Sequence, residues 1–290
     1  MLVLSLIDNQ FSVESAYLNR VDCLECRLDL NPELDIESLR KFQKPLIITL
    51  RHQSHGGAYP GPIESLCHLI LNHCEAYLPD YLDIDIRMPK TLFLAIRQQY
   101  PSIKIIASYH QFSANLTALK TFLEAQVDCD ILKLAMVCNT ASEVLQLLQL
   151  KTNKPIALIP MGEKASFGRV IGKIFGNHLD YVCLNDTQKT GLGQLSLEEM
   201  IKIYHHDTID STTKIYALLA KPVAHSIGHL FHNQYFVAQE QNAVYVKIEQ
   251  GIDGLQELLT QMLPLPFYGL SLSMPLKQAF KSKQVVNTLC

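Results

Sequence analysis

Short hydrophobic runs alternate along the first two-thirds of the chain with longer segments whose apolar positions recur every three or four residues. Short continuous runs are typical of buried strands, and the three–four spacing is typical of amphipathic helices. The predicted strands are Leu2–Ile7, Asp22–Leu28, Pro45–Arg51, Tyr81–Ile86, Ile103–Ser108, Ile131–Ala135, Pro155–Pro160 and Tyr181–Leu184. The predicted helices are Ile63–Tyr77, Pro89–Gln99, Asn115–Gln126, Thr140–Leu150 and Leu197–Tyr204.

The alternation of strands and helices indicates an α/β protein with a parallel sheet. Strands flanked by helices are buried on both faces and therefore continuously apolar, as these runs are. Eight strands within residues 1–208 fit a (β/α)₈ TIM barrel, whose active site gathers at the carboxyl ends of the strands. The pattern leaves a doubly wound open sheet as the alternative.

A polar segment, His205–Lys214, follows the barrel region and is typical of a linker. The elements predicted after it are a strand at Ile215–Ala220, a helix at His229–Glu240, a strand at Val244–Ile248 and a helix at Gly254–Met262. Residues 209–290 are too few for a second full α/β domain. We therefore expect a barrel over 1–208 followed by a partial α/β domain over 209–290.

Composition narrows the class of protein. Of the 290 residues, 48% are hydrophobic and 18% charged, which suits a buried core and argues against extensive disorder. A net charge of −3 gives no general attraction to nucleic acid or membranes, and no apolar run is long enough to span a bilayer. No signal peptide is recognisable, so we expect a cytoplasmic protein. The oligomeric state stays open.

The eight cysteines should be reduced in that compartment. Cys23 and Cys26 form the only CxxC pair, and they lie within a predicted strand, where this spacing directs them to opposite faces. Because no second pair completes a tetrahedral set, packing is the better interpretation than metal binding.

Polar residues end or follow most of the predicted strands. In a barrel, this is the end at which catalytic groups gather. Those at or near strand ends are Ser5, Glu25, Arg27, Arg51, Asp85, Ser108, His110 and Lys133, and Arg169 follows the seventh strand. Each one alone has an ordinary explanation as a cap or a solvated charge, but their recurrence on successive strands indicates a site.

Lys133 lies inside an apolar strand, between Leu132 and Leu134. A buried ammonium is costly unless it is paired, and desolvation favours the neutral, nucleophilic amine that attacks carbonyl groups. A lysine that reaches the barrel mouth or pairs with an acid is the alternative. His110 ends another strand, and imidazole suits general acid–base chemistry.

These residues, with their neighbours, resemble the type I 3-dehydroquinate dehydratases of the shikimate pathway of aromatic amino acid biosynthesis. The resemblance covers about residues 1–205. Its carriers are Leu24-Glu25-Cys26-Arg27-Leu28-Asp29, Thr49-Leu50-Arg51, Gly56-Gly57, Leu82-Asp83-Ile84-Asp85, Ser108-Tyr109-His110-Gln111-Phe112, Leu132-Lys133-Leu134-Ala135, Met161-Gly162, Gly168-Arg169-Val170 and Thr190-Gly191-Leu192-Gly193-Gln194.

The resemblance implies a mechanism without a cofactor. Lys133 would form a Schiff base with the ketone of 3-dehydroquinate. His110, oriented by Asp85, would remove a proton and later protonate the departing hydroxyl, giving 3-dehydroshikimate. The residues implied to hold this small-molecule substrate are Ser5, Glu25, Arg27, Arg51, Arg169, Thr190 and Gln194.

Two departures from the family pattern stand out. The histidine's usual partner is glutamate, and here Asp85 is one methylene shorter. The usual Ser-Ala-Pro-Gly-Gln loop is Thr190-Gly191-Leu192-Gly193-Gln194, which keeps a hydroxyl and loses the stiffness of proline. We expect activity to survive both, with a loop that is more mobile before substrate binds.

Three histidines, His225, His229 and His232, have helical spacing that would suit zinc. Pro222 and Gly228 indicate that the helix starts after His225, so we expect no metal site. A resemblance to the substrate domain of shikimate dehydrogenase explains this region better. It rests on Ala220-Lys221-Pro222-Val223-Ala224-His225-Ser226, His232-Asn233, Phe236 and Tyr268-Gly269-Leu270-Ser271-Leu272-Ser273-Met274-Pro275-Leu276-Lys277.

By this second resemblance, Ser226 and Ser273 would contact shikimate, and Lys277 would be the catalytic lysine. A complete dehydrogenase would use NADP, but no Gly-x-Gly-x-x-Gly phosphate loop occurs in the sequence. We therefore expect no dehydrogenase turnover from this chain alone. The remaining alternatives are another lysine-imine barrel enzyme, such as a class I aldolase, and a non-catalytic binding remnant of a bifunctional enzyme.

Overall fold

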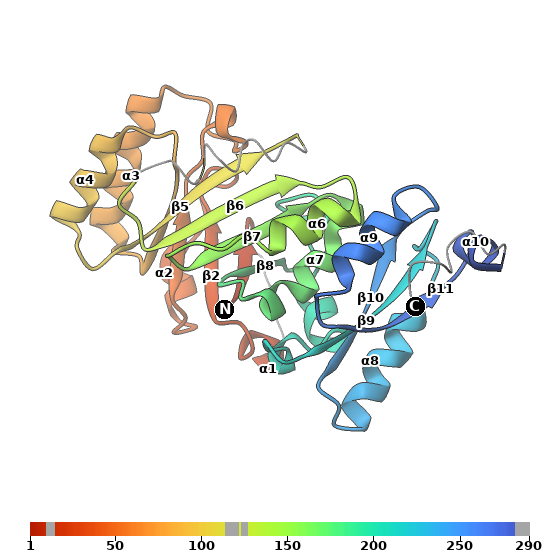
Figure 1. The fold of residues 1–290 in the computed structure, drawn as a ribbon. Helices are drawn as coiled ribbons and strands as arrows, with labels where there is room; N and C mark the ends of the chain where they lie inside the picture. Colours follow the sequence, from red (N-terminus) through yellow and green to blue (C-terminus); the bar gives the residue numbers. More distant parts are fainter. Residues whose placement is uncertain (10–14, 114–121, 123–126, 282–290) are drawn as a thin grey trace.

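Eight parallel strands form one curved sheet, in a computed structural model that describes residues 1–9, 15–113, 122 and 127–281 (Figure 1). The strands are β1 (Leu2–Leu6), β2 (Cys23–Arg27), β3 (Leu46–Thr49), β4 (Tyr81–Asp85), β5 (Lys104–Gln111), β6 (Ile131–Val137), β7 (Ile156–Met161) and β8 (Asp180–Cys183). Their order, β7-β6-β5-β4-β3-β2-β1-β8, follows the sequence around a nearly closed barrel. The predicted barrel is confirmed, and the open doubly wound sheet is excluded.

Helices cover the outside of this sheet (Figure 1). They are α1 (Ser15–Leu18), α2 (Ile36–Arg40), α3 (Ile63–Tyr77), α4 (Lys90–Gln99), α6 (Ala141–Leu148) and α7 (Ser166–Ile171), and a π-helical turn occupies Glu199–Ile203. The predicted helix Asn115–Gln126 lies, apart from Phe122, outside the described residues. Within the described part of the chain, no helix has the length and apolarity that a bilayer crossing requires.

Side chains that point into the barrel change character in steps of two residues, the period of a strand. Toward the amino ends they form an apolar cluster that includes Val3, Cys23, Ile47, Ile106, Ile131, Ala157 and Tyr181. Two residues further along the strands, buried polar groups replace them, namely Ser5, Glu25, Thr49, Asp83, Ser108 and Lys133. The barrel is therefore plugged by an apolar layer that carries a layer of charged and hydroxyl groups.

The seam between β7 and β8 is held by the buried side chain of Asn177. Its Oδ1 accepts a hydrogen bond from the backbone N–H of Leu158, and its Nδ2 donates to the Leu179 carbonyl and, at 2.7 Å, to Asp180. The neighbouring backbone N–H of His178 donates to the Ile156 carbonyl at 2.8 Å. One amide side chain thus satisfies backbone groups that no strand ladder covers.

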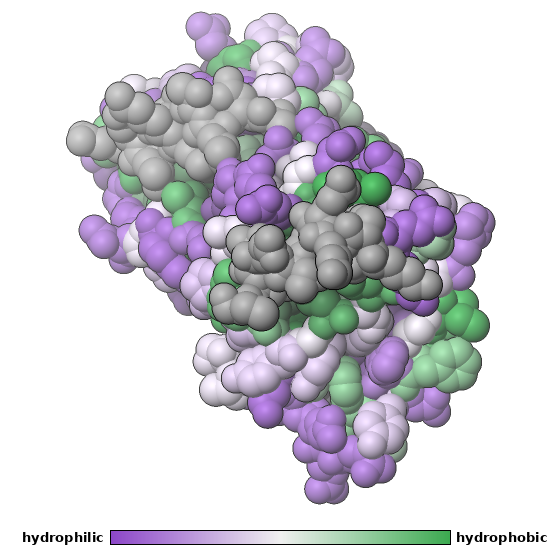
Figure 2. Space-filling model, turned by 45° about the vertical axis from the view of Figure 1, so that its right-hand side comes forward, coloured by the Kyte–Doolittle hydropathy of each residue, from purple (hydrophilic) through white to green (hydrophobic). Residues whose placement is uncertain are grey.

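A second, smaller α/β domain follows. Its parallel strands β9 (Lys214–Ala220), β10 (Ala243–Glu249) and β11 (Phe267–Leu272) run in the order β10-β9-β11, with helices α8 (Gly228–Ala238), α9 (Leu255–Met262) and α10 (Leu276–Lys281). Strand β11, which was not predicted, is an edge strand with exposed Tyr268 and Leu270, so its sequence lacks a continuous apolar run. Apolar side chains accordingly show among polar ones on the surface of this domain (Figure 2).

The connection between the domains, which the sequence predicts as a polar linker, is packed against the barrel at His206. His206 is buried and its Nε2 lies 2.9 Å from Asp180 on β8. Beyond it, the rings of Tyr204 and His229 lie 6.0 Å apart, and Lys164 forms a 3.0 Å salt bridge with Glu249. His206 therefore binds this segment to the barrel, while Asp207, Thr208 and the polar residues of 210–212 are exposed.

We predict that Asn177→Ala lowers the free energy of unfolding by about 1–3 kcal/mol, because it leaves the buried Leu158 N–H without a partner. Urea unfolding followed by circular dichroism measures the change. The control is Asn153→Ala, which removes an exposed asparagine and should shift stability by no more than about 0.5 kcal/mol. Equal stability of the two variants would show that Asn177 does not hold the seam.

Candidate active site

A cavity of about 490 Å³ opens at the carboxyl ends of the barrel strands. This is the end of the barrel at which the strand-end polar residues were expected to meet. The charged and polar residues around it are Glu25, Arg27, Arg51, His110, Lys133, Glu163, Arg169, Lys189, Thr190 and Gln194. The structure thus brings together most of the predicted site residues, from strands β2, β5 and β6, helix α7 and the loop after β8.

Lys133 is 5% exposed and is surrounded on several sides. Its Nζ donates a 2.8 Å hydrogen bond to Oδ2 of Asp83 and lies 3.6 Å from Oε1 of Glu25. The same nitrogen lies 3.8 Å from the ring centroid of Tyr181. A buried ammonium needs such compensation, because desolvation without a partner would be prohibitive.

Asp83 and Glu25 are in turn held as carboxylates by their neighbours. Burial would raise the pKa of Asp83, but the charges of Lys133 and Arg51 hold that pKa well below its usual range. Its Oδ1 also accepts hydrogen bonds from Ser108 at 2.6 Å and Arg51 at 3.1 Å. Burial likewise opposes ionisation of Glu25, and Lys133 with Arg27 reverses this to give a lowered pKa.

Hydroxyl groups complete the shell around Glu25. Ser5 donates to Oε2 at 2.6 Å, and Thr49 donates to Oε1 at 2.8 Å. Ser5 does not line the cavity, so in this structure its contact is with Glu25. Both oxygens of the carboxylate are therefore fixed, which orients the side of Glu25 that faces Lys133.

His110 is buried, and among the described residues its Nδ1 has no hydrogen-bond partner. Burial, followed by the positive charges of Arg51 and Lys133, lowers the pKa of His110 well below its usual value. The imidazole is consequently neutral near pH 7. A neutral imidazole in the cavity can accept a proton, which is the requirement for a general base.

Asp85, the predicted partner of His110, has its contacts elsewhere. Its carboxylate forms a bidentate pair with Arg87, at 2.7 Å for both bonds, and lies 3.8 Å from Nδ1 of His55. The carboxylate whose charge acts on His110 is that of Asp83. The orienting role of Asp85 stays a prediction.

Arginine side chains bring positive charge to the cavity, where it could bind an anion. Arg27 is occupied by a bidentate pair with Asp29, at 2.9 and 2.8 Å. Arg169 donates only to the backbone carbonyls of Pro160 and Leu192, and burial lowers its pKa to about 10. Because no carboxylate of the described residues pairs with it, Arg169 carries a charge that a ligand carboxylate could balance.

The loop after β8 is pinned through Gln194. Its Oε1 accepts hydrogen bonds from the backbone N–H of Thr190 at 2.8 Å and from the Thr190 hydroxyl at 3.1 Å. Gly193 has φ +70°, and a Cβ there would lie 2.1 Å from the backbone oxygen of Gly162. Glycine is thus required at this position for close approach of two backbone segments.

Two important residues of the site were not singled out from the sequence. Asp83 stands two residues before Asp85, and the period of a strand places both inside the barrel. That alternation was the signal that could have identified Asp83. Tyr181 begins a predicted strand and gave no comparable signal, because its contact with Lys133 spans two strands.

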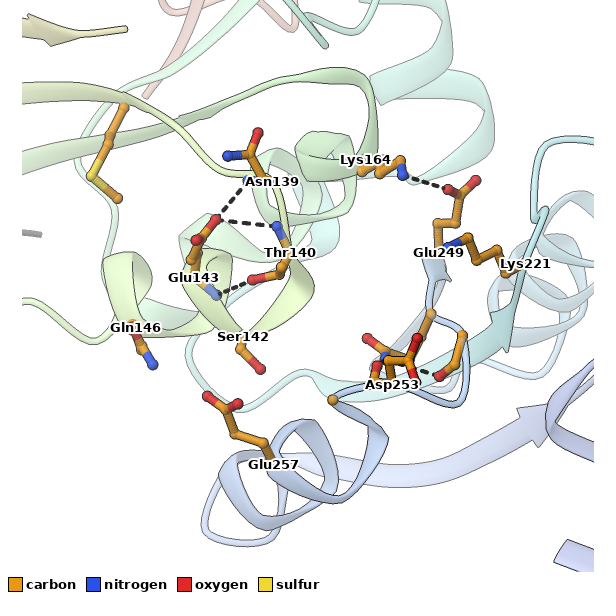
Figure 3. A pocket seen from close by; sticks show the side chains of 14 residues that line it. Asn139, Thr140, Ser142, Glu143, Gln146, Lys164, Lys221, Glu249, Asp253 and Glu257 are labelled. Carbon is orange, nitrogen blue, oxygen red and sulfur yellow. Dashed lines mark hydrogen bonds and ion pairs between the residues drawn. The ribbon is translucent and has the colours of Figure 1, made fainter. Parts of the chain in front are cut away.

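A second cavity, of about 590 Å³, lies between the domains (Figure 3). Lys164 is paired there with Glu249, and Glu143 caps helix α6 by accepting from the Asn139 and Thr140 backbone. These five residues therefore form structural pairs.

The predicted residues of the second domain lie after the carboxyl ends of its strands, Ser226 after β9, Ser273 after β11 and Lys277 on α10. Lys221 donates through its backbone N–H to the Met274 carbonyl at 3.1 Å, which joins the segments that follow β9 and β11. Lys277 is exposed, and its backbone N–H donates to Ser273.

The three histidines of this domain do not converge. His225 precedes helix α8, while His229 lies near Tyr204 and His232 stacks on Tyr245 at 4.3 Å. Across the described residues, no group of three His, Cys, Asp or Glu could hold a metal ion.

Two family models match the chain. The type I 3-dehydroquinase model matches residues 7–211, which is well over half of the sequence. The model of the shikimate dehydrogenase substrate binding domain matches residues 218–284. The boundary between the two matches falls within the connection between the two domains.

Curated relatives include both bifunctional and single-domain proteins. The shikimate biosynthesis protein AroDE of Chlamydia pneumoniae is 31% identical over 270 residues, covering 90% of this chain and 54% of that protein. The 3-dehydroquinate dehydratase of Methanocaldococcus jannaschii is 31% identical over 206 residues, covering 68% and 93% respectively. The chain spans about half the length of the bifunctional relatives.

Solved structures agree in fold. The dehydroquinate dehydratase and shikimate dehydrogenase from S. pombe AroM has a TM-score of 0.55 at 20% identity, covering 97% of this chain and 58% of that chain. The type I 3-dehydroquinate dehydratase of Clostridium difficile has a TM-score of 0.57 at 21% identity, covering 72% and 92%. With its barrel, its cavity and these matches, the chain belongs to the type I 3-dehydroquinase family and carries a shikimate dehydrogenase substrate-binding domain after the barrel.

Proposed function

We propose that the barrel dehydrates 3-dehydroquinate to 3-dehydroshikimate, as a lyase of the shikimate pathway, through a Schiff base on Lys133. The observation that carries the proposal is the setting of Lys133: a buried lysine in a cavity that also holds a neutral imidazole and an unpaired guanidinium. The 3-dehydroquinate dehydratases among the relatives support the assignment.

The cavity offers a complementary group for each part of this substrate. A carboxylate fits the planar fork of Arg169, with Arg51 as a further donor because its Nε is buried without a hydrogen-bond partner in the described residues. Gln194, Thr190 and Glu25 present amide, hydroxyl and carboxylate groups to the ring hydroxyls. The substrate ketone then reaches Nζ of Lys133 at the floor of the cavity.

The reaction follows from these positions. Lys133 gives up one ammonium proton, and its amine attacks the ketone carbon. That proton is returned to the departing oxygen, so loss of water leaves a protonated C=N bond. His110 removes a proton from the adjacent carbon. The C–H electron pair forms a C=C bond while the C=N pair moves onto the nitrogen, which gives an enamine. Return of that pair expels the hydroxyl group, which takes the proton from His110 and leaves as water. Hydrolysis then frees the product and Lys133.

This chemistry uses the chain's own residues and needs no cofactor, because the protonated imine serves as the electron sink. We propose the cytoplasm as its compartment, which the biosynthetic role of the relatives supports. The partner is a small-molecule substrate.

For the second domain we propose binding of shikimate at the edge that carries Ser226, Ser273 and Lys277, without hydride transfer by this chain alone. The match to a substrate binding domain supports the first part. The absence of a Gly-x-Gly-x-x-Gly phosphate loop from the 290-residue sequence supports the second, since NADP would need such a site.

Borohydride reduction in the presence of 3-dehydroquinate should add the reduced substrate to Lys133 and to no other lysine, because only a protonated imine is reduced. Peptide mass spectrometry locates the label. Lys133→Met should abolish it, and Lys277→Met, which changes the exposed lysine of the second domain, should leave it intact. Label on another lysine, or none with folded protein, would contradict the Schiff base and favour a binding protein.

His110→Asn should lower kcat by about two to four orders of magnitude, the usual contribution of a general acid–base, while Lys133 remains open to borohydride labelling. The control is His68→Asn on the outer face of α3, which should keep the normal rate. Absorbance of the conjugated product gives the rates. If His110→Asn lost both the borohydride label on Lys133 and the rate, His110 would have a structural role instead of transferring protons.

The wild-type rate should also persist to low pH. Protonation of His110 stops it from accepting a proton, and its pKa is lowered by burial and by Arg51 and Lys133. The acidic limb of kcat therefore lies below pH 6.5, near which an ordinary histidine titrates. A limb at or above that value, in the same absorbance assay, would exclude a neutral buried His110 as the base.

Added 3-dehydroshikimate and NADPH should produce no NADPH oxidation, measured by its fluorescence, at protein concentrations that dehydrate 3-dehydroquinate. A thermal-shift assay tests shikimate binding separately. Shikimate should raise the melting temperature of the wild type, and this increase should disappear in Lys277→Met. Oxidation of NADPH that depends on Lys277 would overturn the proposal that the chain lacks hydride transfer.

A further inference from the structure

The ring of Tyr181 lies against the nitrogen of the reactive lysine, 3.8 Å from Nζ of Lys133 to the ring centroid. This is well within the range at which an aromatic face attracts a cation. Tyr181 is on β8 and Lys133 on β6, with β7 between them. The β7 residue in register with Lys133 is Ala157, whose small side chain leaves room for the aromatic ring to reach across.

Three groups from three strands surround the nitrogen. Asp83 of β4 accepts its hydrogen bond at 2.8 Å, Glu25 of β2 lies at 3.6 Å, and the ring of Tyr181 faces it from β8. Lys133 and Tyr181 both line the cavity. The side of the nitrogen that these three groups leave uncovered is therefore the side from which a ketone can approach.

The hydroxyl of Tyr181 does not account for the contact between its ring and Lys133. It is buried and has no hydrogen-bond partner among the described residues. Burial, with the nearby charges of Glu25 and Asp83, raises the pKa of Tyr181 well above its usual value, so the phenol stays neutral. The interaction with Lys133 is consequently made by the ring face, and phenylalanine would preserve it.

We infer that Tyr181 is a positioning residue for the imine chemistry: its ring face holds the nitrogen of Lys133 toward the cavity and stabilises positive charge on it. The inference rests on the proposed Schiff base. It assigns the two acids and the ring different tasks. Asp83 and Glu25 compensate the charge through hydrogen bonds and salt bridges, and the ring stabilises the same charge without competing for a proton.

Replacing Tyr181 by phenylalanine and then by mono-, di- and trifluorophenylalanine weakens the π face stepwise at nearly constant volume. A weaker π face stabilises the ammonium less, so the amine forms at lower pH. The pH of half-maximal borohydride labelling of Lys133 should therefore fall with each fluorine, by about one unit across the series. Tyr181→Phe itself should label like the wild type.

The same series at Tyr81 is the matched control, because Lys104 lies 5.4 Å from its ring centroid at the other end of the barrel. Fluorination there should leave the labelling profile unchanged. Normal labelling of Tyr181→Phe with no shift across the fluorinated series would overturn the role of the ring and leave the Schiff base standing. Failure of the wild-type protein to label at Lys133 would overturn both.

Discussion

The active site depends on keeping one ammonium group buried. Lys133 is 5% exposed, and its charge is balanced by Asp83, Glu25 and the face of Tyr181. Removing any charged partner would leave an uncompensated charge in a medium of low polarity, which costs several kcal/mol. The need for these partners places Glu25 of β2 and Asp83 of β4 in the polar layer with Lys133, above the apolar layer that holds Tyr181 of β8. A site for carbonyl chemistry results because the nitrogen stays open on the remaining side.

The same balance decides what the arginines can do. Arg27 is neutralised by Asp29, while Asp83 is shared between Lys133 and Arg51. Arg169 has only backbone carbonyls as partners, so the positive charge that the site leaves for an anionic substrate lies at this residue. These cations also hold His110 neutral, because Arg51 and Lys133 add to the effect of burial. The positive charges of the cavity therefore serve two purposes: Arg169 can bind an anion, and Arg51 and Lys133 keep His110 neutral so that it can act as a base.

Much of the fold and of the active site could be predicted from the sequence, because apolar strand segments and the polar residues at their ends are local patterns. The eight strands, Lys133, His110 and the arginines follow from such patterns. The partners do not: Asp83 is 50 positions from Lys133, and only the strand order and register bring the two together. Asn177 was missed because its side chain bonds backbone groups between β7 and β8, where no strand pairing exists among the described residues. Strand β11 was missed because none of its residues is buried.

The two lysines that the sequence singled out show why residue identity alone does not define a catalytic group. Lys133 is enclosed by acids and an aromatic ring inside a closed barrel, so desolvation and fixed geometry act on its amine. Lys277 is exposed on α10, beside an edge strand whose Tyr268 and Leu270 also face solvent. Its side chain is exposed to water, and no hydrogen bond or ion pair holds it among the described residues. A lysine becomes a nucleophile or a proton carrier through what encloses it, and in this chain the barrel provides that enclosure.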